Sequence, residues 1–463
     1  MPLRRRTLAV ALMIAAGGAL TAVALLRPPT RASAASPPSA RAHATPSLDE
    51  HERRARDIAF YERRVSQDSQ SALDRSLLAT LYVQRARATG DVGDYSRAES
   101  LARRSLELRT ARNDHTFAML ASTLLARHAF AEALAVARRA DSLAPGVPAN
   151  LALLGEIELE MGHYAAADSH FAAIRWDGQH LGVAARLARW RELGGRVDAA
   201  RRLLRGAAER AGRRDDLPSE QVAWFHFRLG ELELRAGRLA AADSALRRGL
   251  AVFPDDYRIL GALARLAAAR ERWTESIDYG NRAIAIQLDP ATLGTISEAY
   301  AATRDTARAA EYARAMTVNA LRQPGPIHRA WGLFALDHGT PSDARRVLAK
   351  ARAEARERQD VYGDDLTAWA LHRLGRHADA RVAITRALAR GTEDAQLEYH
   401  AGMIALATAD TVAALRHLER VAALNARFSP SQSPIARRTL DALRARRALS
   451  SSTPGPRPST PPT

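Results

Sequence analysis

The side chains that could carry chemistry in this chain are histidines, carboxylates and arginines, because cysteine is absent. Without cysteine there is no disulfide, no thiolate metal ligand and no cysteine nucleophile. The 14 histidines include three pairs at short spacing: His163 and His170, His372 and His377, and His400 and His417. None of these pairs forms the H-E-x-x-H pattern of a zinc protease. We therefore expect surface and turn roles for the histidines and no metal site.

Nucleotide-binding and hydrolase motifs are also missing. A phosphate-binding P-loop needs a lysine after its glycines, and the only lysine, Lys350, follows Leu-Ala in a helical stretch. Neither G-x-G-x-x-G nor G-x-S-x-G occurs. Adjacent carboxylates at 215–216 and 364–365 stand where helices should begin, and there they cap free backbone N–H groups. We expect no catalytic residue, no cofactor and no enzymatic activity.

Residues 223–256 show which elements must position the side chains. Apolar residues recur at three- and four-residue steps on both sides of Gly237: Phe227, Leu229, Leu232 and Leu234 before it, and Leu239, Ala242, Leu246, Leu250 and Val252 after it. This spacing predicts two amphipathic helices joined by a tight turn. Pro254 ends the second helix, because its ring removes a backbone donor. Such a pair cannot bury its apolar faces alone, so it needs neighbouring pairs.

The same pattern recurs along the chain. Its turn positions lie 33 to 36 residues apart, with one step of 42: His128, Gly162, Gly195, Gly237, Glu271, Arg304, Gly339, Gly375 and Ala409. A small residue stands five positions after each turn and another seven before it, as Ala167 and Gly155 do around Gly162. Small residues there let helices cross closely. We predict an all-α fold with about ten repeats over residues 71–428.

This pattern resembles the tetratricopeptide repeat (TPR) family. The resemblance rests on Leu-Gly steps at 154–155 and 229–230, aromatic residues two positions after turns, and prolines that end second helices: Phe130, Tyr164, Trp273, Pro145 and Pro254. It implies an α-solenoid that coils into a right-handed superhelix. It also implies that the first helices line a concave groove that binds segments of partner proteins.

The outward residues of the first helices are therefore candidates for a partner groove: Trp224, Phe227, Glu231, Arg258, Arg265, Tyr362, Asp365, Trp369 and Tyr399. Aromatic and arginine anchors are typical of such grooves. An alternative for each aromatic, Phe227 and Trp369 among them, is that it packs between repeats. The family's clamp for a C-terminal carboxylate uses Asn and Lys, which this chain lacks at these positions, so we do not expect it to bind a chaperone tail.

The N-terminus should be an export signal or a membrane anchor. Three arginines at positions 4–6 precede an uncharged apolar run of 20 residues at 7–26. This run is long enough to form an N-terminal apolar helix across ~30 Å of hydrocarbon, while the A-x-A pattern at 32–34 fits signal cleavage. Residues 1–26 are thus a signal peptide or a single-pass anchor. Either one would place the rest in the cell envelope, outside the cytoplasmic membrane.

Composition divides the remainder. Residues 27–46 are rich in Pro, Ser and Ala and should form a disordered linker. The helical repeats should occupy residues 47–432, and one more helix at 433–449 should cap the end of the stack. Residues 450–463, with five prolines and no periodicity, should be a disordered tail.

The net charge of +17 and the isoelectric point near 11.0 allow two functions. Arginines alternate with Asp and Glu, as at 138–142, which favours a solvated face over a nucleic-acid site. The first hypothesis is a non-enzymatic scaffold that binds protein segments in its groove. The alternative is a binder of an anionic polymer, polysaccharide or nucleic acid, through the arginine-rich surface, and polysaccharide would suit a location outside the membrane better. The sequence does not indicate the oligomeric state.

Overall fold

The computed structural model describes residues 48–175, 178, 180–322 and 327–452. Within these residues every regular element is an α-helix, and there are 22 of them, so the predicted all-α class is confirmed. A lead-in helix, α1 (Leu48–Gln67), precedes ten helix pairs. The pairs are α2 (Ala72–Thr89) with α3 (Val92–Leu108), α4 (Asp114–Ala126) with α5 (Phe130–Leu143), α6 (Pro148–Met161) with α7 (Tyr164–Ala173), α8 (Leu181–Leu193) with α9 (Val197–Ala211), α10 (Ser219–Arg235) with α11 (Leu239–Val252), α12 (Tyr257–Ala269) with α13 (Trp273–Ile286), α14 (Pro290–Ala302) with α15 (Thr306–Arg322), α16 (Arg329–His338) with α17 (Pro341–Glu354), α18 (Val361–Arg373) with α19 (His377–Leu388), and α20 (Ala395–Ala407) with α21 (Thr411–Asn425). A final helix, α22 (Ser433–Ser452), follows.

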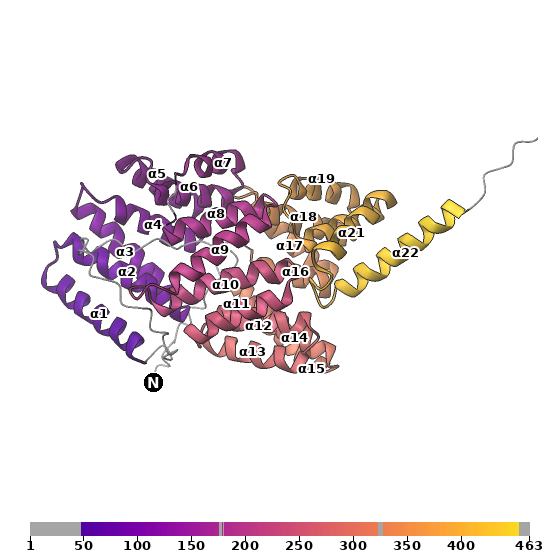
Figure 1. The fold of residues 1–463 in the computed structure, drawn as a ribbon, viewed down its shortest axis with the longest axis horizontal. Helices are drawn as coiled ribbons and strands as arrows, with labels where there is room; N and C mark the ends of the chain where they lie inside the picture. The colour runs from indigo at the N-terminus through magenta and orange to yellow at the C-terminus, as the bar shows by residue number, and fades with distance from the viewer. Residues whose placement is uncertain (1–47, 176–177, 179, 323–326, 453–463) are drawn as a thin grey trace, which may run out of the picture.

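The pairs form a stack in sequence order, as Figure 1 shows from α1 to α22. All extensive helix–helix contacts of the described residues join a helix to the next one or the next but one. Buried apolar side chains accordingly form a series of clusters along the stack rather than a single central core. This arrangement is expected when each pair buries its faces only against its neighbours.

The turns have the backbone geometry that the spacing predicts. Eight of the nine predicted turn residues adopt a positive φ: His128, Gly162, Gly195, Gly237, Glu271, Arg304, Gly375 and Ala409. Gly339 is the exception, with φ of −91°. The reason is the sequence that follows it, because Thr340 forms a capping box with Asp343 and Pro341 occupies the first position of α17.

The small residues lie where paired helices cross. A Cβ added to Gly155 would approach the ring of Phe171 to 2.6 Å, and one added to Gly230 would approach Leu246 to the same distance. The small residues that follow the turns, such as Ala167, are also buried. The two helices of each pair therefore meet at a distance that only a small side chain permits.

The stack also closes on itself, which the sequence did not predict. Turns between the helices of early pairs contact loops that precede late pairs, and we call this line of contacts the seam. At the seam, the N–H of Gln359 donates to the carbonyl of Met161 at 3.2 Å, and the hydroxyl of Thr392 donates to the carbonyl of Leu193 at 2.7 Å. One further contact, between the Asn425 amide and the carbonyl of Leu234, measures 3.0 Å.

Two tyrosines cross the seam in opposite directions. Tyr164 of α7 accepts a hydrogen bond from the N–H of Val361 at 2.7 Å, 197 residues along the chain, and it packs against the apolar cluster of the late pairs. Tyr362 of α18 packs against the cluster formed by α6, α7 and α8. Arg390 adds an ion pair with Asp168 at 2.5 Å. The seam thus combines hydrogen bonds, apolar packing and charge.

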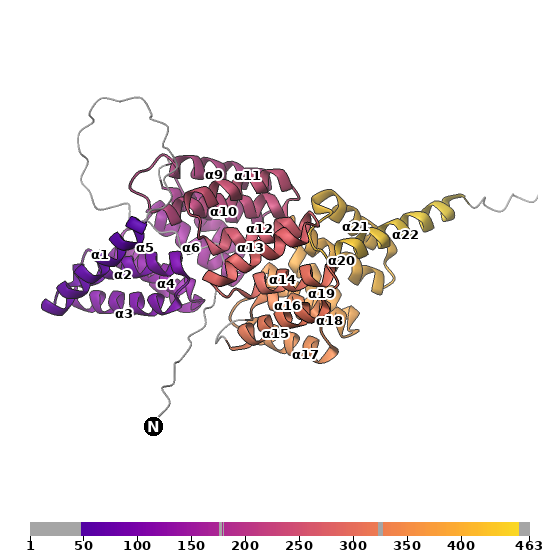
Figure 2. The same ribbon diagram turned by 90° about the horizontal axis from the view of Figure 1, so that it is seen from below.

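The C-terminal helix α22 extends beyond this closed stack. The N-terminal half of α22 buries Ala436, Leu440 and Leu443, while its remainder projects away from the body in both views (Figures 1 and 2). The helix continues to Ser452, three residues past its predicted end at 449. Residues 1–47 and 453–463, with the predicted signal or anchor, linker and most of the tail, lie outside the described residues. Among the described helices, none has the length and apolar character of a membrane span.

The seam can be tested at its closest backbone contact. A Cβ on Gly162, where φ is +80°, would lie 2.0 Å from the carbonyl oxygen of Gln359. Gly162→Ala should therefore lower the unfolding temperature more than Gly375→Ala, because Gly375 has a similar φ of +75° and no atom within 4 Å. Both variants carry about 1–2 kcal/mol of backbone strain from the positive φ. Only Gly162→Ala adds a steric clash with the carbonyl oxygen of Gln359. Equal loss in thermal unfolding would contradict a close-packed seam.

Candidate functional site

The closed stack encloses a cavity of about 530 Å³. Most of its lining comes from the first helices of the pairs, between α2 and α20. One wall is the segment 425–430, which lies between α21 and α22. Its apolar part includes Leu234, Ile327, Leu333 and Phe334. The cavity is therefore the inner side of the superhelix, narrowed by the closure of the seam.

Six of the nine predicted groove residues line this cavity: Trp224, Phe227, Glu231, Arg258, Arg265 and Tyr362. Trp224 and Phe227 are half-buried, and each also packs against an apolar cluster of its own repeats. The structure thus gives Phe227 both of the roles that the sequence left open, packing and cavity lining. Both side chains therefore border the cavity and remain partly exposed.

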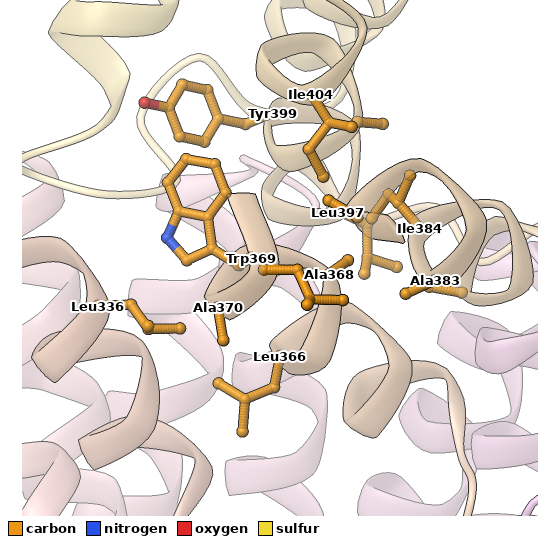
Figure 3. Packing of buried hydrophobic residues seen from close by; sticks show 14 of the residues in the cluster. Leu336, Leu366, Ala368, Trp369, Ala370, Ala383, Ile384, Leu397, Tyr399 and Ile404 are labelled. Carbon is orange, nitrogen blue, oxygen red and sulfur yellow. The ribbon is translucent and has the colours of Figure 1, made fainter. Parts of the chain in front are cut away.

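The other three predicted residues do not line the cavity. Asp365 is fully buried and bonds His400 Nδ1 at 2.7 Å and Arg329 at 3.4 Å. Trp369 is 4% exposed and Tyr399 is 3% exposed, and Figure 3 shows their rings together among buried aliphatic side chains. The indole Nε1 of Trp369 donates to Asp337 at 2.8 Å. Trp369 and Tyr399 therefore pack between repeats, which was the alternative to a role in the groove.

A first group of charges lies on α8, α10 and α12. Glu192 is surrounded by Arg189 at 3.3 Å, Arg228 at 3.7 Å and Arg235, which bonds it directly. Burial would raise the pKa of Glu192, but the arginines bring that pKa down to about 2. Glu231 pairs with Arg235 at 3.7 Å and bonds Arg265 directly. We call these four arginines and two glutamates the basic group.

A second group surrounds one arginine at the loop that follows α17. Arg358 pairs with Asp360 at 2.8 Å, Glu160 at 3.4 Å and Glu354 at 3.7 Å. Burial raises the pKa of Glu160 and of Glu354. We call this the acidic group, because three carboxylates share a single guanidinium.

Tyr362 lies beside the basic group and contacts two guanidinium groups. Arg329 of α16 stands over its ring at 4.0 Å and Arg189 of α8 at 5.5 Å. These contacts bring together side chains of α8, α16 and α18, which lie far apart in sequence, and the seam makes them possible. Cation–π contacts of this kind hold both guanidinium groups at the cavity wall.

A third charged cluster occupies the α12 end. Arg258 pairs with Asp256 at 2.6 Å and with Glu220 at 3.2 Å. Asp256 also accepts from the N–H groups of Arg258 and Ile259, so it caps α12. Within this cluster the charge of Arg258 is balanced by Asp256 and Glu220.

Among the described residues, no group of three or more His, Asp or Glu side chains could hold a metal ion.

Sequence reasoning found Glu231 and Arg265 but missed the cavity residues Arg189 and Glu298, which the same signal could have found. The residue six positions before each of five successive turn residues, Gly162 to Arg304, is charged, and the sign alternates: Glu156, Arg189, Glu231, Arg265 and Glu298. Three of these, Arg189, Glu231 and Arg265, belong to the basic group described above. Arg228 and Arg235 lie four and eleven residues after Trp224, on the same face of α10. Glu354 and Arg358 gave no such signal, because they flank a loop outside the repeat pattern.

The family comparison supports this architecture. Residues 223–266 match the family model of the tetratricopeptide repeat. The match begins where the periodic pattern of residues 223–256 begins. It covers most of α10, all of α11 and most of α12, and α10 and α12 line the cavity. No curated protein matches the chain.

Several solved structures are similar. *Pseudomonas aeruginosa* PilF has 16% identity and a TM-score of 0.37, covering 48% of this chain and 96% of that one. A TPR protein from *Parabacteroides merdae* has 15% identity and a TM-score of 0.34, covering 57% and 98%. The Cut9–Hcn1 assembly of the APC/C has 13% identity and a TM-score of 0.33, covering 86% and 94%.

Two arginines of the cavity should respond oppositely to replacement by methionine. Arg228 is 9% exposed, and among the described residues its only ion pair is the 3.7 Å contact with Glu192. Glu192 keeps two other arginines when Arg228 is replaced. Burial lowers the pKa of Arg228. Arg228→Met should therefore leave the free energy of unfolding unchanged or raise it. Arg258→Met should lower it by roughly 3 kcal/mol or more, because Asp256 and Glu220 lose their cation. Urea unfolding measures both, and the reverse order would contradict this account of the charges.

The pH dependence of stability should depend on His128 at the cavity wall. Burial, reinforced by Arg358 and His328, lowers the pKa of His128 from 6.5 to about 4. Between these values the unfolded chain binds a proton that the folded chain does not, so this residue makes stability fall as pH falls from about 6.5 to 4. His128→Asn keeps a residue that tolerates a positive φ and should reduce that loss. Thermal unfolding at pH 7 and pH 5 measures the difference, and identical pH profiles would refute the assignment.

Proposed function

We propose that this protein is a non-enzymatic scaffold that binds a segment of a partner protein in its central cavity. The observation that carries the proposal is the cavity itself, lined by half-buried aromatic side chains beside charged ones. TPR-type folds are typical of protein–protein interaction scaffolds, and residues 223–266 match that family. The proposal of no enzymatic activity rests on the absence of catalytic motifs from the sequence.

The chemistry of the cavity suits a polypeptide. Trp224, Phe227 and Phe334 offer apolar rings, and arginines and carboxylates stand beside them. Buried aromatic anchors next to arginine are the side chains that supply most binding energy at protein interfaces. A volume of about 530 Å³ falls in the range of small-ligand pockets, so the bound segment is short and extended rather than a helix, whose diameter is about 10–12 Å.

An anionic polymer is the less favoured occupant. Its recognition needs a continuous surface of one sign, whereas cavity arginines such as Arg258, Arg265 and Arg358 are paired with carboxylates. Opposite charges side by side suit a partner that carries both.

We also propose that binding takes place outside the cytoplasmic membrane, in the cell envelope. The support is the basic positions 4–6 followed by the apolar run at 7–26, a pattern that directs the following chain across a membrane. If the run is uncleaved, it would tether the scaffold to the membrane.

Photo-crosslinking tests the site. A photoreactive phenylalanine at Phe227, in the cavity, should yield discrete crosslinked polypeptides from the native envelope. The same residue at Phe60, which is 46% exposed on α1, is the matched control and should not. Trp224→Ala combined with Arg265→Ala should abolish the products at 227. The cavity would not be the binding site if Phe227 and Phe60 gave the same crosslinked polypeptides. The same conclusion would follow if the products at Phe227 persisted in the double variant.

A further inference from the structure

The cavity carries two centres of opposite charge that its own side chains leave unbalanced. The basic group has four arginines, Arg189, Arg228, Arg235 and Arg265, and two carboxylates, Glu192 and Glu231. The acidic group has three carboxylates and one arginine, Arg358. Each group therefore has an excess of two charges, positive in one and negative in the other.

The remaining charges of the wall do not cancel these excesses. Arg258 is matched by Glu220 and Asp256, Arg329 by Asp365, and His338 by Glu298. Asp394 caps the N-terminus of α20 by accepting from two backbone N–H groups. The lining also includes Arg87, Arg427 and Asp337, of which Asp337 accepts hydrogen bonds from Trp369 and Gln432. Glu156, which bonds Arg186 at 2.6 Å, also interacts electrostatically with Arg189 and Arg228, so it offsets the basic excess in part. Glu160 of the acidic group likewise attracts Arg189, so the two groups face each other across a short distance.

Single atoms show where compensation is missing. Within the described part of the chain, the guanidinium of Arg228 reaches a carboxylate only at 3.7 Å. Nε of Arg189, whose side chain is 9% exposed, has no hydrogen-bond partner there. Arginine cannot lose its proton in a protein, so it cannot remove the excess by neutralising. In the acidic group, Glu354 lines the cavity and meets Arg358 only at 3.7 Å. Uncompensated buried charge is costly, and a ligand of matching charge removes that cost.

We infer that the segment bound in the cavity carries an acidic and a basic side chain, the acid placed against Arg228 and Arg189 and the base against Glu354. This inference rests on the proposed scaffold function and adds the chemistry of its partner. Because Arg228 lies on α10 and Glu354 on α17, the two charges also fix the direction in which the segment lies. An aromatic side chain between the two charges would contact the faces of Trp224 and Phe227.

Synthetic peptides test the inference on the full chain. The probe is acetyl-Asp-Ala-Phe-Ala-Arg-amide, compared with its Asp-to-Asn form, its Arg-to-Gln form, the form with both changes, and the reversed sequence. Isothermal titration calorimetry should give at least about tenfold weaker binding for each singly neutralised peptide. The reversed sequence should also bind more weakly.

Two variants assign each effect to its centre. Arg228→Met should remove the preference for Asp over Asn and keep that for Arg over Gln, and Glu354→Gln should do the opposite. Glu354→Gln keeps the oxygen that accepts from the N–H of Ile327, and circular dichroism checks that both variants fold. The matched controls are Arg202→Met and Glu311→Gln on the exposed faces of α9 and α15, which should change neither preference.

The outcomes separate this inference from the scaffold function. If all five peptides bind equally, or if the preferences persist in Arg228→Met and Glu354→Gln, the charge centres do not select the ligand, while the cavity remains a binding site. If no peptide binds, the inference is overturned, and crosslinking at Phe227 still decides the scaffold function independently.

Discussion

The backbone contact at the seam is the constraint on which the rest of the structure depends. At Gly162 and Gly195 the early turns come so close to the late loops that a Cβ would lie 2.0 Å and 2.3 Å from carbonyl oxygens. The coil of helix pairs is therefore wound until its successive parts touch. Without this contact the inner face would be an open groove, and α8 would not meet α16 and α18 around Tyr362.

Much of the fold could be predicted because it is local. The spacing of small and turn residues depends only on the contacts of one pair with the next, so it located ten pairs and eight left-handed turns. Closure of the stack depends instead on small rotations that add up over many repeats. No single residue determines the total rotation of the stack, so the sequence pattern does not predict closure. The seam residues Gln359 and Thr392 also lie in loops, where the periodic pattern stops.

The candidate site was predictable to the extent that it follows helix faces. Trp224, Phe227 and Glu231 were found because they share a face of α10, whereas Trp369 and Tyr399 were misplaced because the same face is covered where the late pairs pack more deeply. The two charge centres could not be read from the sequence. They arise where α6, the loop after α17 and the helices α8 to α12 converge across the seam.

The tyrosine that reaches 197 residues along the chain changes how this array should fold. An open solenoid contains only short-range contacts, so any part of it can form and melt nearly independently. Here the last pairs supply contacts to the middle ones, and loops of this length must be ordered before the long-range contacts form. The closed stack should therefore unfold more cooperatively than an open one, and its central cavity should close only after these long-range contacts form.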